Sequence, residues 1–320
     1  MASRLKRALK KKQSRTQCSL HPSWPKQIQL EVANSCNQDC LFCFINTMKR
    51  SKKRMDLEFG RRIMTEAYEE GSRVISFAAG AEPLMHPNLD AFIRIAKQEL
   101  NYDYVFLTTN GMVTQKKLSR WDQFIEAGLE SVKISINAGD RETYKKVHRR
   151  DHFDQVIASI KHLSKLKKKY DFFLGVSSVS LPQNEESITH LEPLIGHLVD
   201  EVLVVPADNQ SGQMIEYDTF ISENCKLPFT RIYVTAEGYL RMCCGDMENF
   251  LAVEDLNQMS LKEAFYSERT TEFRRRHLEK NLEGTLCYRC LNSVQDPIEP
   301  LNPDIADRWS HSIEIISKSA

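Results

Sequence analysis

Three cysteines, Cys36, Cys40 and Cys43, lie within eight residues and constrain the chain more than any other feature. They follow an alternating apolar run, with Ile28 and Leu30, that predicts a β-strand. Three thiolates this close on one loop can converge on one metal centre. A [4Fe–4S] cluster takes four cysteine thiolates, so three local ligands leave one iron open to another molecule. The spacing also allows a zinc site that a distant fourth ligand completes.

The composition favours a metal-binding protein with reduced thiols. The 320 residues, 41 % of them apolar, suffice for about two domains with a substantial core. Nine cysteines without an apolar signal segment predict a cytoplasmic protein whose thiols bind metal rather than form disulfides. No stretch is apolar enough for a membrane span, and a net charge of +1 gives no general attraction to nucleic acid. The basic residues 1–16 predict a solvated tail, with contact to an acidic partner as the alternative.

Strands and helices alternate over residues 27–207, after a basic tail of residues 1–26. Further apolar strands are predicted at residues 74–77, 104–108, 131–136, 172–179 and 201–205. Amphipathic helices are predicted at residues 56–70, 89–100, 116–127, 153–169 and 185–198. This rhythm is typical of parallel βα units, and six such strands form most of a barrel whose sites lie at the C-terminal strand ends. We therefore predict an α/β fold, a partial (β/α)6 barrel similar to a TIM barrel.

A second, smaller domain is predicted over residues 208–296. Residues 231–234 and 239–242 flank a Thr-Ala-Glu-Gly turn and indicate a β-hairpin, and a charged helix is expected over residues 261–278. This region has its own cysteines. Residues 297–320 contain three prolines and predict an irregular surface tail.

Polar and glycine-containing groups stand where the predicted strands end. The carboxyl ends of parallel strands meet at one edge of a sheet, so we expect these groups to lie close to the cysteine triad. They are Gly80, Ala81, Glu82 and Pro83 after the second strand, Asn110 after the third, Ser135 and Asn137 after the fourth, and Asn184 after the fifth.

The triad and these strand ends together resemble the radical S-adenosylmethionine (SAM) superfamily. The resemblance implies that Cys36, Cys40 and Cys43 hold a [4Fe–4S] cluster whose fourth iron binds SAM. It also implies that the backbone of Phe42 lies near the adenine. Reductive cleavage of SAM would then yield a 5′-deoxyadenosyl radical that abstracts hydrogen from a substrate.

The strand-end groups are assigned to SAM by the same resemblance. Residues 80–83 read Gly-Ala-Glu-Pro where the family has Gly-Gly-Glu-Pro, and this motif is expected to contact the SAM ammonium through Glu82. His148 occupies the commonest place of the arginine that binds the SAM carboxylate, so we assign that role to Arg149, one residue later. The remaining SAM-binding residues are expected to be Asn110, Ser135 and Asn137. Of these, Ser135 is expected to contact the methionyl part of SAM.

The second domain resembles the twitch extension, a shortened SPASM domain. The resemblance implies that four cysteines bind one auxiliary cluster, expected to be [4Fe–4S]. A zinc site is the physical alternative. Cys244 is left over, and it is a packed residue, a substitute for Cys243 or a thiol hydrogen donor. The four expected ligands are Cys225, Cys243, Cys287 and Cys290.

These features predict a radical SAM oxidoreductase of the dehydrogenase kind. We expect hydrogen abstraction from a polar small molecule (an amino sugar, cyclitol or sugar conjugate), oxidation through the auxiliary cluster, and a reductant such as flavodoxin or ferredoxin. Epimerisation with Cys244 as hydrogen donor and maturation of a peptide are the alternatives. The short basic tail leaves no room for a leader-recognition domain, which disfavours the peptide. A non-catalytic iron–sulfur module is the alternative outside enzymes.

Overall fold

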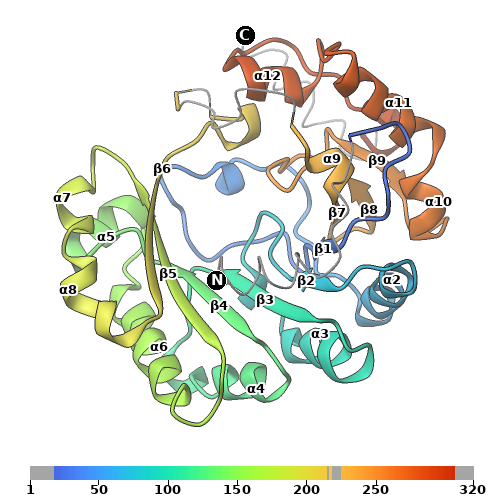
Figure 1. Cartoon of the computed structure of the whole chain (residues 1–320). Coiled ribbons are helices and arrows are strands. Elements are labelled where there is room, and N and C mark those ends of the chain that lie inside the picture. The colour runs from blue at the N-terminus through green and yellow to red at the C-terminus, as the bar shows by residue number, and fades with distance from the viewer. Residues whose placement is uncertain (1–17, 215, 218–224, 307–320) are drawn as a thin grey trace.

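The computed structural model describes residues 18–214, 216–217 and 225–306, so the basic residues 1–16 lie outside the described part. Nine strands form one sheet in the order β6-β5-β4-β3-β2-β1-β7-β8-β9 (Figure 1). The strands are β1 (Gln27–Leu30), β2 (Val74–Ser76), β3 (Tyr104–Thr109), β4 (Ser131–Ser135), β5 (Phe173–Ser180), β6 (Glu201–Pro206), β7 (Arg231–Val234), β8 (Tyr239–Arg241) and β9 (Ala252–Asp255).

Every neighbouring pair from β1 to β6 is parallel. Strand β7 pairs in parallel with β1, and β8 and β9 extend the sheet in antiparallel fashion. The α/β prediction of a partial barrel with a C-terminal hairpin region is thereby confirmed. Strand β6 is the last strand on one side of the sheet and does not pair with β7. The barrel is therefore open between these two strands.

Helices cover the outside of the curved sheet (Figure 1). Helix α2 begins where predicted, because the Asp56 side chain accepts a hydrogen bond from the Phe59 N–H and caps it. The barrel helices are α2 (Leu57–Glu69), α3 (Leu89–Arg94, continued by a π-helical turn at Ile95–Glu99), α4 (Arg120–Glu126), α5 (Arg141–His148), α6 (Phe153–Leu166), α7 (Glu185–Ile188) and α8 (Leu191–Ile195). The later helices are α9 (Leu227–Thr230), α10 (Leu261–Phe265), α11 (Glu268–Leu278), α12 (Leu286–Asn292) and α13 (Pro303–Ala306).

Two predicted helices are each divided, and the helices α5, α9, α12 and α13 were not predicted. The span 185–198 breaks between α7 and α8, because Pro193 lacks an N–H and its ring would clash with the carbonyl of Thr189 in a continuous helix. The span 261–278 breaks before α11, where the Ser267 side chain accepts from the Thr270 N–H and starts a new helix. The unpredicted helix α5 is capped by Asp140.

Side chains alternate between the two faces of the barrel strands. The outward face packs against the helices in one buried core, and it includes Ile28, Ile75, Leu107, Ile134, Val176 and Ile232. The inward face is more polar. Because side chains alternate along each strand, Gln29, Thr108 and Ser135 point inward, and all three line the same cavity. The chemistry therefore belongs to the inner face.

The predicted border between the domains, at residues 207 and 208, stays a prediction. The structure adds that the region after it shares the barrel's sheet, since β7 pairs with β1 over four residues from Gln27 to Leu30. Of the described helices, none combines the length and the apolar character that crossing a membrane requires.

Candidate functional site

The cysteine triad lies on a loop between β1 and α2 that α5 holds in place. The Asp39 and Leu41 N–H groups donate to the carbonyls of His148 and Val147 at 3.1 and 2.9 Å. The Gln38 amide donates to the Tyr144 hydroxyl at 2.7 Å. The C-terminal end of α5 thus fixes the backbone around Cys40.

His148 contacts the triad itself. Its Nε2 donates to the Ile136 carbonyl at 2.8 Å, so its Nδ1 is the acceptor that faces the Cys40 thiol at 3.1 Å. Burial lowers the pKa of His148 to about 4, and the ring is neutral at pH 7. Arg149 differs: its side chain is 56 % exposed, it pairs with Asp39 at 3.8 Å, and it does not line the cavity described next. Its assignment to the SAM carboxylate stays a prediction.

A cavity of about 460 Å³ lies between the triad and the strand ends. The loop contributes Cys36, Cys40, Cys43 and Phe42, and the strand ends contribute Gly80, Ala81, Glu82, Asn110, Ser135 and Asn137. The structure therefore brings these ten predicted residues to one cavity, whereas Pro83 is buried at the start of the short helix η2 (Pro83–Met85). Sequence reasoning missed Gln29, Thr108, Ser211 and Met247, which also line it and belong to no recognisable motif.

The thiols of the triad fit a cluster. Burial raises the pKa of Cys36 to about 12 and also raises those of Cys40 and Cys43, so the free thiols stay protonated and metal binding would remove their protons. In the described part of the chain, no three His, Cys, Asp or Glu side chains converge closely enough for a single metal ion. A cubane cluster instead spreads its thiolates over separate irons. Three thiols that border one roomy cavity suit that arrangement.

Glu82 is a buried carboxylate that joins two strand ends. It accepts hydrogen bonds from Thr109 Oγ1 at 2.6 Å, from the Asn110 N–H at 2.7 Å and from the Leu84 N–H at 2.9 Å. Burial nevertheless raises its pKa, because the three donors only partly offset the loss of hydration. Since a carboxylate has about four acceptor positions, one remains for a donor in the cavity.

The fourth and fifth strand ends are tied together by asparagines. The Asn137 side chain accepts from the Val179 N–H at 2.7 Å, and the Asn184 amide donates to the Asn137 carbonyl at 2.8 Å. Asn137 has a φ of +55°, a conformation that asparagine tolerates better than most residues. Ser135 and Ser177 share a hydrogen bond at 3.2 Å beside them. Asn184 therefore shapes the edge of the cavity without lining it.

A second cavity, of about 190 Å³, holds the other four predicted cysteines. Cys287 and Cys290 are three residues apart on α12 and so lie on one helix face. Cys225 precedes α9 and Cys243 follows β8. All four line this cavity, and this set of donors fits a cluster whose ligands all come from the protein. The pKa is raised at the thiols of Cys225, Cys243 and Cys287.

Cys244 lines both cavities. The neighbouring Cys243 thiol, by hydrogen bonding, lowers the pKa of Cys244 to about 6 despite its burial. The carbonyl of Cys244 lies 3.1 Å from the place that a Cβ on Gly80 would occupy. Cys244 therefore forms part of the wall between the two cysteine sites.

A buried ionic network, here called the Arg50 clamp, joins the triad loop to the C-terminal region. The Arg50 guanidinium binds Glu31 at 2.5 Å and Glu237 at 2.6 Å, and the clamp consists of these three residues. All three side chains are less than a tenth exposed. Arg50 follows the triad by seven residues and Glu237 lies in the turn between β7 and β8, so the clamp fixes one cysteine site relative to the other.

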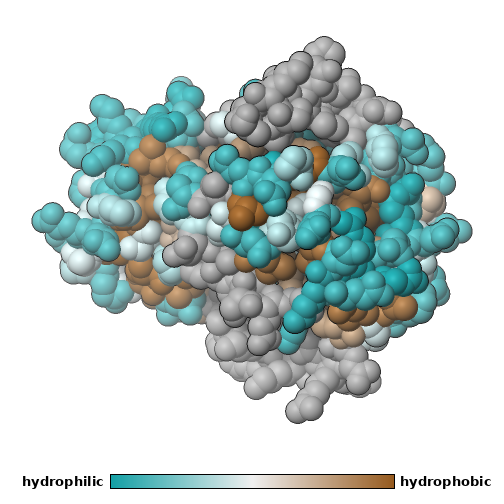
Figure 2. Space-filling view, turned by 90° about the horizontal axis from the view of Figure 1, so that it is seen from above, coloured by the Kyte–Doolittle hydropathy of each residue, from teal (hydrophilic) through white to brown (hydrophobic). Residues whose placement is uncertain are grey.

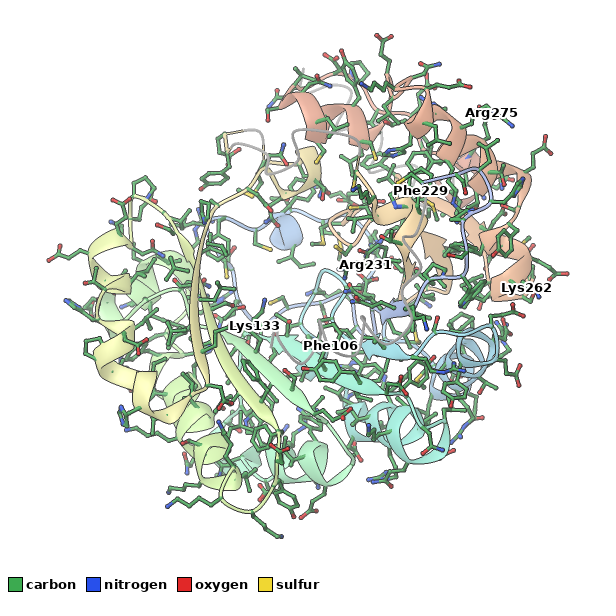
Figure 3. All side chains as sticks on the ribbon, in the orientation of Figure 1. Phe106, Lys133, Phe229, Arg231, Lys262 and Arg275 are labelled. Atoms are coloured by element: carbon green, nitrogen blue, oxygen red, sulfur yellow. The ribbon has the colours of Figure 1, made fainter. Side chains whose placement is uncertain are left out.

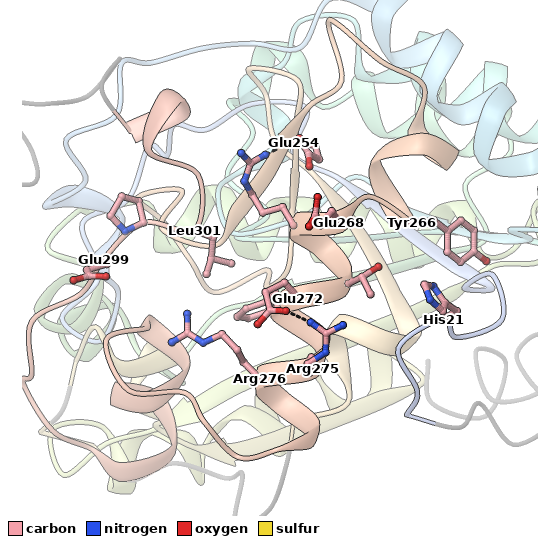
Figure 4. A pocket seen from close by; sticks show the side chains of 13 residues that line it. His21, Glu254, Tyr266, Glu268, Glu272, Arg275, Arg276, Glu299 and Leu301 are labelled. Atoms are coloured by element: carbon pink, nitrogen blue, oxygen red, sulfur yellow. Dashed lines mark hydrogen bonds and ion pairs between the residues drawn. The ribbon is translucent and has the colours of Figure 1, made fainter.

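A third cavity, of about 880 Å³, lies elsewhere and carries none of this chemistry. It opens beside α11 and is lined by charged residues that include Glu272 and Arg275, which pair with each other, together with His21 and Leu301 (Figure 4). No cysteine lines it.

A family model described as the radical SAM superfamily matches residues 30–192, just over half of the chain. This chain belongs to the radical SAM superfamily. A second model, an iron–sulfur cluster-binding SPASM domain, matches residues 225–291, which include all four cysteines of the smaller cavity. The protein is therefore a radical SAM enzyme with a SAM-binding [4Fe–4S] site and an auxiliary iron–sulfur domain.

Two curated relatives differ in how much of the chain they share. GTP 3′,8-cyclase of Chlorobaculum tepidum is 32 % identical over 136 residues, and this match covers 42 % of the chain but only 40 % of the cyclase. The S-adenosyl-L-methionine-dependent 2-deoxy-scyllo-inosamine dehydrogenase of Niallia circulans is 23 % identical over 273 residues, with 84 % of the chain and 94 % of the relative covered.

Solved structures share the fold of this radical SAM protein over most of its length. BtrN in complex with AdoMet and 2-DOIA has a TM-score of 0.55 at 19 % identity, covering 84 % of this chain and 92 % of BtrN. Streptococcus suis SuiB bound to the precursor peptide SuiA has a TM-score of 0.66 at 16 % identity, covering 88 % of this chain and 76 % of SuiB. These similarities establish the fold and leave the substrate open.

Proposed function

We propose that this protein oxidises a polar small molecule, with loss of hydrogen, in a radical SAM reaction that ends at the auxiliary cluster. The observation that carries the proposal is Cys244, which lines both the cavity of the triad and that of the auxiliary cysteines. A substrate in the cavity of the triad would be separated by Cys244 from a cluster in the smaller cavity, which could accept an electron. The 2-deoxy-scyllo-inosamine dehydrogenase of Niallia circulans, similar along nearly its whole length, supports the same reaction class.

When bound, the two clusters and SAM would supply one-electron cleavage of SAM, a hydrogen-abstracting radical and an acceptor for the second electron. A substrate carbon that bears a hydroxyl would lose a hydrogen atom, then an electron and a proton, and become a carbonyl carbon. The chain's own residues hold this arrangement. Cys36, Cys40 and Cys43 would ligate the first cluster, and Glu82 would accept from the SAM ammonium.

The electrons for the first step must come from outside the chain. We propose a low-potential one-electron donor such as flavodoxin or ferredoxin. For the auxiliary site we propose a [4Fe–4S] cluster on Cys225, Cys243, Cys287 and Cys290, because four thiols surround one small cavity. An amino sugar, a cyclitol or a sugar conjugate is the proposed substrate class.

Epimerisation is the second candidate, and the place of Cys244 favours it too. The Cys244 sulfur borders the substrate cavity, and when it carries its proton it is positioned to return a hydrogen atom to a substrate radical. Product mass separates the two reactions, because oxidation removes two hydrogens and epimerisation leaves the mass unchanged.

Anaerobic reconstitution with iron and sulfide, followed by SAM and dithionite, tests the proposal. We expect about eight irons per chain and release of 5′-deoxyadenosine. A Cys36→Ala, Cys40→Ala, Cys43→Ala variant is the control and should keep about four irons. If the wild-type protein releases no more 5′-deoxyadenosine than this variant, the enzyme function is refuted and the non-catalytic iron–sulfur module is supported.

A further inference from the structure

A layer of inward-facing side chains lies directly below the floor of the cavity of about 460 Å³ that the cysteine triad borders, here called the larger cysteine cavity. Gln29, Thr108 and Ser135 line that cavity. The residues two positions earlier on the same strands face the same side, about 6.5 Å deeper in the barrel. They are Gln27 on β1, Phe106 on β3 and Lys133 on β4.

Arg231 completes this layer from β7. It is the register partner of Gln27, and the next residue on its strand, Ile232, pairs with Ile28 in the outward core. Arg231 therefore faces inward, and it acts electrostatically on Tyr233 and Cys244 at the wall between the cysteine sites. Figure 3 labels Lys133 and Arg231 on the β4 and β7 walls, on the inner side of the ring.

Neither cation has an ion pair within the part of the chain that the structure describes. No carboxylate of a described residue lies within 4.0 Å of the Arg231 guanidinium or the Lys133 ammonium. Glu201 is the carboxylate that influences Lys133, from β6 and across Gly175. Burial lowers the pKa of Lys133, and Glu201 offsets this effect only in part.

Two buried polar groups near the cations lack a hydrogen-bond partner among the described residues. Gln27 is only 2 % exposed, and its Nε2 donor has no hydrogen-bond acceptor among the described residues. The buried Oγ of Ser131, two residues before Lys133, is likewise unpaired there. Unsatisfied buried polar groups are costly, and an unpaired amide and an unpaired hydroxyl beside two cations suit a ligand that supplies acceptors.

The acids of the larger cysteine cavity lie in its upper layer and are already bonded. Glu82 accepts three hydrogen bonds from Thr109, Asn110 and Leu84. Asp208 accepts from the backbone and the side chain of Gln210 at 3.0 and 2.9 Å. A molecule in the cavity thus meets bonded carboxylates near the cysteines, and the two cations, which have no ion pair among the described residues, lie one layer of side chains below it.

We propose that Gln27, Lys133 and Arg231 bind an anionic group of the substrate, a phosphate or a carboxylate. This proposal rests on the proposed function and narrows its substrate class to acidic sugar conjugates or sugar acids. The guanidinium would bind two oxygens of such a group, and the ammonium would add a point charge. The reacting carbon would then lie above the anion, toward the triad.

Matched sugars that differ in one group test the charge preference. The reconstituted, SAM-loaded protein is titrated anaerobically by calorimetry with glucose, glucose 6-phosphate, glucuronate and glucosamine at constant ionic strength. We expect one anionic sugar to bind at least tenfold more tightly than glucose, and glucosamine to bind no better than glucose. The favoured anion distinguishes phosphate from carboxylate. If neither anion binds more tightly than glucose, or if none of the four binds, the proposal is wrong.

Variants show which residues cause the preference for anionic sugars. Lys133→Met and Arg231→Met should each reduce the anion preference at least fivefold, Lys133→Arg should keep most of it, and Lys146→Met, at an exposed position on α5, should leave it unchanged. A preference that survives in the double variant Lys133→Met, Arg231→Met would place the anion elsewhere and overturn the assignment. Iron content and absorbance show whether each variant is folded.

Substrate-free SAM cleavage, measured on the same samples, separates the two proposals. Cleavage without an anion preference contradicts only the anion site. An anion preference without cleavage in the wild-type protein contradicts only the proposed function.

Discussion

Gly80 shows how one residue can decide the contact between the two halves of the molecule. Its φ is +119°, and a Cβ there would lie 3.0 Å from Met247 Sδ and 3.1 Å from the Cys244 carbonyl. Arg241 donates to the Ala79 carbonyl at 2.7 Å beside it. The loop after β2 thus rests directly on the segment that carries Cys244, and glycine is required by the backbone angle and by the lack of space.

Gly80→Ala should therefore destabilise the protein more than an alanine at Gly71. Gly71 has nearly the same φ, +115°, but nothing lies within 4 Å of its missing Cβ. We expect Gly71→Ala to lower the free energy of unfolding by about 1 kcal/mol, from backbone strain alone. Gly80→Ala should cost about 1–3 kcal/mol more and weaken SAM binding. Denaturant unfolding and SAM titration measure both, and equal costs at the two sites would contradict the close contact.

Glu248 predicts a pH dependence of stability. Burial raises its pKa to about 7, and its Oε2 has no hydrogen-bond partner among the described residues, while Oε1 accepts from the Lys49 N–H at 2.7 Å. From about pH 4.5 to 7 the folded protein keeps a proton that the unfolded chain has released, so stability falls as pH rises.

Glu248→Gln should remove this slope. The glutamine keeps an acceptor for Lys49 and carries no charge, so the variant should be more stable than the wild type at pH 8, by up to about 3 kcal/mol. Thermal unfolding from pH 5 to 8 checks this. Glu58→Gln, at a side chain that is 78 % exposed, is the control. If the stability of Glu248→Gln falls with rising pH as steeply as that of the wild type, other groups cause the pH dependence.

At the scale of elements, helix α12 determines whether two cysteines reach the auxiliary cavity. The Thr285 side chain caps it by accepting from the Tyr288 N–H at 3.3 Å and donating to the Leu282 carbonyl at 2.6 Å. The cap begins the helix two residues before Cys287, and the helical turn then brings Cys290 to the same face. The sequence shows the spacing of two residues between the cysteines, and only the capped helix orients them.

Thr285→Val should remove the cap and lower the iron content of the auxiliary site. The expected cost is about 1 kcal/mol of stability, and about half of the auxiliary iron should be lost on brief exposure to a chelator. Asp56→Ala removes the cap of α2 and is the matched control, with a similar stability cost and no effect on iron. Iron analysis and thermal unfolding distinguish the two. If both variants lose iron equally, general destabilisation explains the effect.

Across the whole molecule, the Arg50 clamp is a buried polar link between the two cysteine sites. Arg50 is buried between Glu31 on the barrel side and Glu237 on the hairpin side, and it also donates to the Met247 carbonyl at 3.2 Å. The clamp is reinforced where Asn34 donates to Glu237 at 2.9 Å. Loss of the guanidinium would leave the buried Glu237 carboxylate without its cation and would leave Glu31 with Arg241 alone, 3.6 Å away.

Arg50→Met should thus lower the free energy of unfolding by about 3–5 kcal/mol. Arg61→Met, which removes an exposed ion pair with Glu99, should cost at most about 1 kcal/mol. Arg50→Lys keeps the charge and loses the paired geometry, so it should fall between them. Denaturant unfolding of the three variants checks the order. A cost for Arg50→Met no larger than that for Arg61→Met would show that the clamp does not hold the two sites together.

The cysteine spacings and the strand-end motifs let the sequence alone determine the superfamily and the partial barrel, because both depend on local patterns. Cys36, Cys40 and Cys43 are close in the chain, and the strands alternate with helices at short range. The tertiary structure decided what lies across the barrel. His148 reaches Cys40 over 108 positions, Arg50 reaches Glu237 over 187, and Arg231 faces the same inner side of the barrel as Lys133 only because β7 pairs with β1. Such pairings depend on strand order and register, which no local pattern specifies.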